Sequence, residues 1–141
     1  MIEKSASAIW TGSLKEGGGT LTSQSGALTD TPYSFATRFE AGKGANPEEL
    51  IGAAHAGCYA MFLSALMGGA NIVPDKISAT STIKLDPTTE GSPTVVAAHL
   101  TVTVKAAATE AVIRDLADKA KGGCPISKLL KAEVTMDLTV G

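Results

Sequence analysis

The sequence predicts an α+β fold in one domain, residues 1–141, because strand patterns and helix patterns occupy separate stretches of the chain. Apolar and polar residues alternate over Ile77–Asp86 and again over Val96–Val104, which is typical of half-buried strands. The segment Leu50–Met67 is instead apolar or small on every side of a helix. A chain of this length can bury a core without a disulfide or a metal.

The remaining strands are short. Ala6–Thr11 and Thr20–Ser25 flank a run of three glycines, and we expect both to be strands, with a third over Tyr33–Phe39. The turn residues Thr88–Pro93 separate the two long strands, so these two should form an antiparallel hairpin. Val134–Val140 repeats the alternation at the C-terminus.

Each predicted helix has residues at its ends that start or stop a helix. Asn46 can cap the long helix, Pro47 suits its first position, and Gly68 with Gly69 ends it. The other two predicted helices are an amphipathic one from its cap at Thr109 to Gly122, and a short one over Pro125–Lys131 with Cys124 at its cap.

Composition excludes several classes of protein. The net charge is -2 and no run of like charges is long enough to attract phosphate backbones, so we expect no nucleic-acid partner. Met1–Trp10 lacks the pattern of a secretory signal, which predicts a cytoplasmic protein with reduced thiols. Two Cys and two His without close spacing do not predict a metal site, and we expect no cofactor.

The long apolar helix needs cover on every face. Leu50–Met67 reaches the length of a membrane span, but His55, Ser64 and the glutamates before it argue against a membrane partner. A small two-layer domain covers only one side of such a helix. We therefore expect the other side to meet a second subunit in a homodimer.

The only two cysteines lie in distinctive contexts. Cys58 is inside the long helix, and Cys124 opens a Gly-Gly-Cys-Pro turn 66 positions later (124 minus 58), which suggests a redox pair. Burial would raise the pKa of the Cys58 thiol, so a thiolate there needs a permanent cation. Helix-start dipoles alone would favour Cys124 as the nucleophile. Taken without its surrounding motif, a lone cysteine in an alanine-rich helix, such as Cys58, is more often a small core residue than a nucleophile.

Five sequence blocks have distinctive residue patterns. They are Thr37–Glu40, Asn46–Leu50, Ala53–Cys58, Gly123–Ser127 and Leu130–Glu133. These blocks resemble the OsmC branch of the OsmC/Ohr superfamily, and the resemblance runs essentially from end to end. It implies an intertwined homodimer with a long central helix and antiparallel sheets. It also implies a thiol-dependent peroxidase that reduces organic hydroperoxides better than hydrogen peroxide and is regenerated by an external dithiol.

The resemblance also implies the site residues. Cys58 matches the peroxidatic cysteine, Cys124 the resolving cysteine, Arg38 the active-site arginine and Glu48 its carboxylate partner. After Cys58 becomes a sulfenic acid, Cys124 would condense with it to a disulfide. The guanidinium of Arg38 stays charged and can favour the thiolate, and Glu48 can hold it through a two-point contact.

Helix geometry constrains how these residues meet. Glu48 and Cys58 are ten positions apart (58 minus 48), which on one straight helix is about 15 Å along the axis. Both cannot serve one site from the same helix. We therefore expect Glu48, with Arg38, to reach the Cys58 of the other subunit.

Other residues leave alternatives open. His55 lies one turn before Cys58 and could polarise the thiol, but a hydrogen-bonded core histidine is the simpler expectation; His99, in a strand, should be at the surface. Five aromatic residues can line an apolar substrate pocket or pack in the core. They are Trp10, Phe35, Phe39, Tyr59 and Phe62.

Two rival functions follow from the same residues. One is a non-enzymatic dimer that binds an apolar ligand and carries redox-sensitive thiols. The other is a thiol-disulfide oxidoreductase, which the sequence disfavours because Cys58 and Cys124 are not in a Cys-X-X-Cys arrangement.

Overall fold

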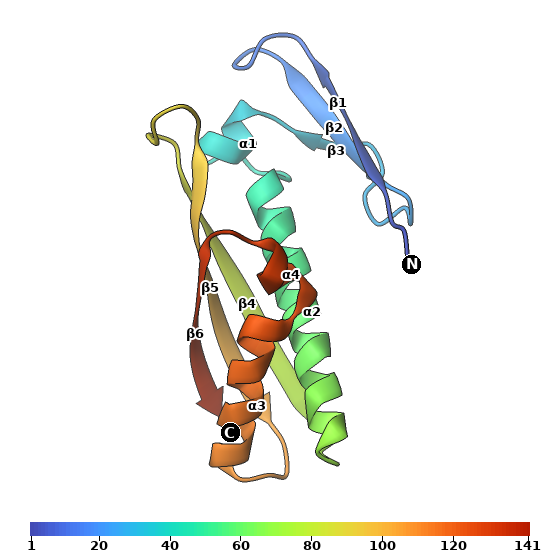
Figure 1. The fold of residues 1–141 in the computed structure, drawn as a ribbon. Coiled ribbons are helices and arrows are strands. Elements are labelled where there is room, and N and C mark those ends of the chain that lie inside the picture. The colour runs from blue at the N-terminus through green and yellow to red at the C-terminus, as the bar shows by residue number, and fades with distance from the viewer. The chain divides into compact units, whose positions relative to one another are not determined.

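The computed structural model describes residues 1–141, and the chain forms two compact units, Met1–Leu50 and Ile51–Gly141. Both contain strands and helices, which confirms the predicted α+β class (Figure 1). The first unit has a three-stranded antiparallel sheet in the order β1-β2-β3. Its elements are β1 (Ala6–Thr11), β2 (Gly18–Ser23), β3 (Thr31–Tyr33) and α1 (Phe35–Phe39).

The predicted strand over Tyr33–Phe39 is wrong, because β3 ends at Tyr33 and the following residues form α1. The cause is a reciprocal cap between two side chains. Ser34 Oγ accepts a hydrogen bond from the Thr37 backbone N–H at 3.3 Å, and Thr37 Oγ1 accepts one from the Ser34 N–H at 2.9 Å. These local bonds favour a helix start over a strand.

The second unit is a three-stranded sheet in the order β4-β5-β6, with α2, α3 and α4 on one face (Figure 1). The long helix begins where predicted, since Asn46 Oδ1 accepts from the Glu49 N–H at 2.8 Å. The last helix is shorter than predicted and ends at Leu129. The elements are α2 (Pro47–Gly69), β4 (Lys76–Asp86), β5 (Thr94–Lys105), α3 (Glu110–Gly123), α4 (Pro125–Leu129) and β6 (Glu133–Val140).

The expectation of antiparallel sheets is correct for β1–β3 and for the β4–β5 hairpin, but β6 runs parallel to β5. The connection explains the difference. The chain leaves β5, passes through α3 and α4, and returns beside β5 in the same direction, as strand–helix–strand units do. The second sheet is therefore mixed.

One stripe of α2 is buried although the helix is apolar all round. Its buried residues recur every third or fourth position, so they lie along one side. Tyr59, Leu63 and Met67 pack in a core with β5 and α3, and the Tyr59 hydroxyl donates to the Ala117 carbonyl at 3.3 Å. The β5 and α3 residues of this core are Leu100, Val102, Val104, Ile113, Leu116, Ala117 and Ala120.

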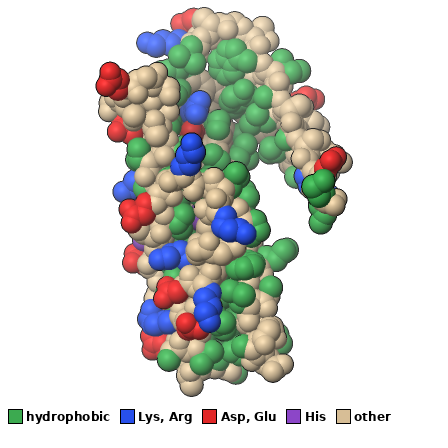
Figure 2. Space-filling model, in the orientation of Figure 1, with side chains coloured by type: hydrophobic (Ala, Val, Ile, Leu, Met, Phe, Trp, Pro, Cys, Tyr) green, Lys and Arg blue, Asp and Glu red, His purple; other side chains and the backbone are tan.

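The other side of α2 has little cover. By length and composition the helix is long and apolar enough to cross a membrane. Only 28% of an apolar 18-residue stretch of it is buried inside the protein. Met61 on this side is 77% exposed. Figure 2 shows charged side chains gathered where α3 and α4 lie, and hydrophobic or uncharged surface on the α2 side of the unit.

A close approach between α2 and β4 depends on Gly52. A Cβ atom at this position would lie 2.8 Å from the Ser81 carbonyl oxygen, which is closer than real Cβ contacts come. The absence of a side chain therefore lets the helix lie directly on the strand. His55, about one turn further along α2, then reaches the Ser81 side chain.

Replacing Gly52 by Ala should lower the free energy of unfolding by about 1–3 kcal/mol, because the new methyl group pushes α2 away from β4. Urea denaturation measures the change. Gly122→Ala is the matched control, since a Cβ there meets nothing within 4 Å; this variant should be as stable as the parent or slightly more so. Equal stability of the two variants would show that the close approach does not hold the helix.

Candidate active site

The two cysteines lie together in the second unit as free thiols. Cys58, on α2, is half-buried, while Cys124, between α3 and α4, is fully buried. Cys124 joins the two helices: its N–H donates to the Ala120 carbonyl at 3.1 Å, and its sulfur accepts from the Ser127 N–H at 3.3 Å. The two thiols interact, because Cys124 contributes to the pKa of Cys58.

The environment of Cys58 raises the pKa of its thiol. Burial is the largest cause, and the charge and hydrogen bond of Cys124 raise the pKa further. A hydrogen bond from the backbone of Ile126 acts in the opposite direction but is outweighed. At neutral pH Cys58 is therefore mainly a thiol unless a cation is brought to it.

His55 is a fully buried histidine with both ring nitrogens hydrogen-bonded, which confirms the expectation of a core residue. Its Nδ1 lies 2.7 Å from Ser81 Oγ, and its Nε2 lies 2.8 Å from Ser127 Oγ. Burial lowers the pKa of His55, so the ring is neutral at pH 7. Its polar partners are two serines rather than Cys58.

Sequence reasoning missed the roles of Ser81 and Ser127, although each gave a signal. Ser81 lies on the same inward-facing side of β4 as Ala79 and Ile83, where a polar side chain needs a buried partner. Ser127 follows Cys124 by three residues, which is the spacing of a side chain that bonds back to a helix cap.

Arg38 and Glu48 form an ion pair in the first unit. Arg38 Nη2 and Nε donate to Glu48 Oε1 at 2.9 and 3.2 Å, and Nε also lies 3.3 Å from Oε2. The pair is positioned by Asn46, which caps α2 and donates to the Thr37 carbonyl of α1 at 3.1 Å. Because the Glu48 side chain is only 12% exposed, the pair is less screened by solvent than a surface ion pair.

Arg38 also borders an apolar hollow of about 270 Å³ in the first unit. Trp10 and Tyr33 pack edge to face at 5.4 Å, and the Arg38 guanidinium lies 5.2 Å from the centre of the Phe39 ring. Of the five aromatic residues singled out in the sequence, three line this hollow, while Tyr59 and Phe62 pack in or against the core of the second unit. The lining residues are Trp10, Leu14, Tyr33, Ser34, Phe35, Arg38 and Phe39.

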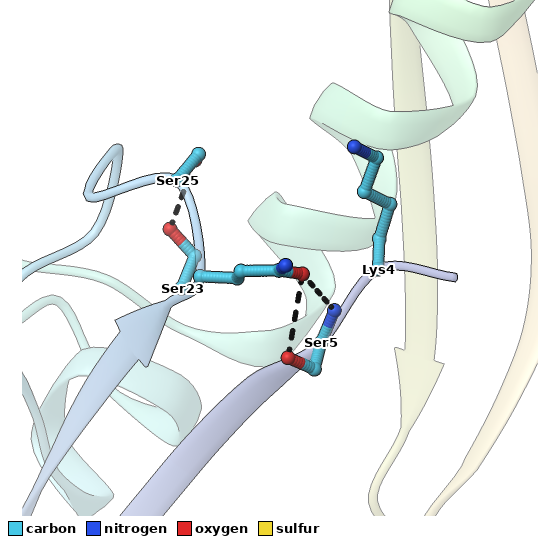
Figure 3. Close-up of a pocket in the computed structure, with 5 residues that line it drawn as sticks. Lys4, Ser5, Ser23 and Ser25 are labelled. Atoms are coloured by element: carbon cyan, nitrogen blue, oxygen red, sulfur yellow. Dashed lines mark hydrogen bonds between the residues drawn. The ribbon is translucent and has the colours of Figure 1, made fainter. Parts of the chain in front are cut away.

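A second hollow of about 430 Å³, lined by residues of polar type, lies at the other end of the β1–β2 pair (Figure 3). Gln24 Oε1 accepts from the N–H of Ser5 at 3.1 Å, and the Ser23 and Ser25 hydroxyls are 3.5 Å apart. The hollow contains neither a thiol nor an arginine, and Lys4 extends away from the serines (Figure 3).

The remaining histidine, expected at the surface, is only partly exposed, with 32% of its side chain accessible. His99 on β5 bonds to Thr135 Oγ1 at 2.7 Å and to Asp137 Oδ2 at 3.1 Å. No group of three or more His, Cys, Asp or Glu side chains lies close enough to hold a metal ion.

Known proteins resemble the chain in sequence and in fold. Peroxiredoxin OsmC of Escherichia coli is 43% identical over 136 residues, which covers 96% of this chain and 95% of the relative. An organic hydroperoxide resistance protein from Elizabethkingia anophelis has a TM-score of 0.71 at 23% identity, covering 97% of this chain and 95% of that one. An OsmC-like protein from Mycoplasma pneumoniae has a TM-score of 0.76 at 16% identity, covering 99% and 97%.

The family model described as OsmC-like protein matches residues 40–139, a range that contains Glu48 and both cysteines. Together with a relative that is 43% identical over almost its whole length, this match decides the assignment. The chain belongs to the OsmC-like protein family.

Proposed function

We propose that this protein is a two-cysteine thiol peroxidase that reduces organic hydroperoxides to alcohols, and hydrogen peroxide less well. The observation that carries the proposal is the pairing of a half-buried thiol, Cys58, with a fully buried one, Cys124. The E. coli relative is a peroxiredoxin and the Elizabethkingia neighbour an organic hydroperoxide resistance protein, which supports the same chemistry here. Residues 1–141 act as one peroxidase domain.

The first step takes place at Cys58. Its thiolate attacks one oxygen of the hydroperoxide, the O–O bond breaks, and the alkoxide leaves as the alcohol after taking up a proton. Cys58 becomes a sulfenic acid. The dipole of a helix start would favour Cys124 as the attacking cysteine. The exposure of the two thiols favours Cys58 instead, because the side chain of Cys124 is 0% exposed and a peroxide cannot reach it.

The second step forms a disulfide. The Cys124 sulfur attacks the Cys58 sulfur, the S–O bond breaks, and water is released. The disulfide protects Cys58 from oxidation to the irreversible sulfinic acid. An external dithiol then reduces the disulfide, so no metal or cofactor takes part.

Arg38 supplies the cation that Cys58 lacks in its own unit. A guanidinium beside the sulfur lowers the thiol pKa and can donate to the departing alkoxide. Glu48 holds it through the hydrogen bonds of their ion pair. The apolar hollow beside Arg38 suits the organic group of a hydroperoxide, since its walls are largely aromatic.

The peroxidase acts as a cytoplasmic homodimer with sites shared between subunits. Glu48 and Cys58 lie on the single helix α2, about 15 Å apart along its axis, so Arg38 and Glu48 serve the partner's Cys58. The uncovered side of α2 supports a second copy as its cover in place of a membrane, because its small residues allow close approach. The exposed residues of this side are Ala53, Ala54, Gly57, Met61, Ser64 and Ala65.

Turnover is the first test. Reduced protein should consume cumene hydroperoxide repeatedly when a dithiol is present, more slowly with a monothiol, and more slowly again when hydrogen peroxide replaces the organic substrate. Peroxide consumption is followed against a protein-free control. If no dithiol-dependent consumption exceeds that control, the protein is instead a binding module that uses the apolar hollow.

The cysteine roles are tested by separate variants. Cys58→Ser should abolish turnover, because no sulfur remains for the peroxide to oxidise. Cys124→Ser should react once and accumulate a sulfenic acid on Cys58, which dimedone traps for mass spectrometry. A dimedone adduct on Cys124 in the Cys58→Ser protein would reverse the assignment.

The shared site is tested by mixing two inactive proteins. Arg38→Ala and Cys58→Ser homodimers should each be inactive, but their heterodimer contains one site with both groups intact and one with neither. Purified heterodimers should therefore recover about half of the parent activity if the sites act independently. Heterodimers as inactive as both homodimers would mean that each arginine serves the cysteine of its own chain.

A further inference from the structure

Cys124 is the start of a buried hydrogen-bond chain that the two steps above do not use. The chain consists of Cys124, Ser127, His55 and Ser81. Cys124 Sγ lies 3.2 Å from Ser127 Oγ, which lies 2.8 Å from His55 Nε2, and His55 Nδ1 lies 2.7 Å from Ser81 Oγ. The four residues come from the α3–α4 junction, α4, α2 and β4.

The hydrogen bonds that link Cys124 to Ser81 all run in one direction when Cys124 is a thiol and His55 is neutral. Ser127 has a single hydroxyl hydrogen, which it donates to His55 Nε2, so its oxygen accepts the hydrogen of the Cys124 thiol. His55 then carries its hydrogen on Nδ1 and donates it to Ser81. In this arrangement no buried side-chain nitrogen or oxygen is left without a partner.

The burial of Cys124 favours a proton acceptor within the protein. Its side chain is 0% exposed, so water cannot take the thiol hydrogen directly. Tyr59 cannot take it, because burial, Asp118 and Cys124 raise the pKa of the phenol and keep it protonated. Asn46, His55 and Ser127 are the buried polar residues, and only the imidazole of His55 can accept a proton at neutral pH.

We propose that Ser127 and His55 carry the thiol hydrogen of Cys124 away as its sulfur attacks the Cys58 sulfenic acid. This inference rests on the proposed peroxidase function. His55 is a positioning residue, because it acts on the reacting sulfur only through Ser127. The direction of these hydrogen bonds also turns the Cys124 thiol hydrogen toward Ser127 and leaves the Cys124 sulfur free to face Cys58.

The Cys124 thiol hydrogen moves to Ser127 Oγ while the Ser127 hydroxyl hydrogen moves to His55 Nε2. The Cys124 sulfur donates an electron pair to the Cys58 sulfur, the S–S bond forms, and the S–O bond of the sulfenic acid breaks with loss of hydroxide. Cys124 is oxidised and Cys58 reduced. His55 passes its Nδ1 hydrogen to Ser81, which is only half-buried and releases a proton to solvent. This proton and the hydroxide together make the released water.

The Ser127 backbone N–H assists the same step. It donates to Cys124 Sγ at 3.3 Å and so stabilises the negative charge that develops on the sulfur. A substitution of the Ser127 side chain leaves this bond in place. The contribution of the hydroxyl can therefore be measured separately from that of the backbone.

Single-turnover mass spectrometry tests the proposal on the full chain. Reduced protein is mixed with cumene hydroperoxide and quenched at successive times with dimedone and a thiol-alkylating reagent, and the sulfenic, disulfide and sulfinic forms of Cys58 are counted. Ser127→Ala should slow disulfide formation by about 100-fold, which is at the lower end of what proton transfer contributes. Formation of the sulfenic acid should change less, and excess peroxide should convert Cys58 to the sulfinic acid.

Two variants separate proton transfer from packing. Ser127→Thr keeps a hydroxyl and should recover most of the rate of disulfide formation. Tyr59→Phe removes a different buried hydrogen bond from the same core and should keep the parent's partition between disulfide and sulfinic acid. If Tyr59→Phe shifts this partition as much as Ser127→Ala does, the effect is one of packing and the proposal fails.

His55→Gln provides a second route if circular dichroism shows that Ser127→Ala does not fold. Gln can bond to Ser127 but cannot take up a proton, so disulfide formation should again be slow. An unchanged rate of disulfide formation in either folded variant overturns the proposal alone. A parent protein that forms no sulfenic acid overturns the peroxidase function, and the proposal with it.

Discussion

The packing of α2 against β4 is the contact on which the thiol pair depends. Gly52 allows the helix backbone to approach the Ser81 carbonyl, and His55 then bridges Ser81 on β4 and Ser127 on α4. This bridge fixes three elements that are far apart in sequence. Cys58, three residues after His55, is thereby held beside Cys124 at the start of α4. A buried imidazole that lost either serine would leave a ring nitrogen without a partner, at a cost of about 1–3 kcal/mol.

Each unit contains different groups of the proposed chemistry. In the second unit, burial and the neighbouring thiol raise the pKa of Cys58, which keeps the sulfur protonated and unreactive. The first unit contains a guanidinium held by a carboxylate of low exposure. In the proposed peroxidase, Cys58 therefore stays protonated until the arginine of the partner subunit is brought to it. The full burial of Cys124 fits the resolving role proposed for it, because a buried sulfur is withheld from peroxide in solution.

Much of the fold could be predicted from sequence, and so could part of the candidate site. Caps at Asn46, Thr109 and Cys124 located three helix starts, and alternation located the long hairpin. The α1 helix was missed because five residues show no periodicity that separates helix from strand, and the Ser34–Thr37 cap is a weak signal. The parallel β6 was missed because alternation does not report strand direction. Ser127 and Ser81 were missed because their roles arise only when α2, α4 and β4 meet.

We propose that a single peroxide oxidises Cys58 and Cys124 of the same chain together. Peptide mapping after one equivalent of cumene hydroperoxide, without any reductant, tests it most directly. We expect one equivalent of cumyl alcohol, loss of both thiols, and a disulfide that joins the Cys58 and Cys124 peptides within one chain. Alcohol formation with both thiols intact, or a disulfide that joins two chains, would contradict it.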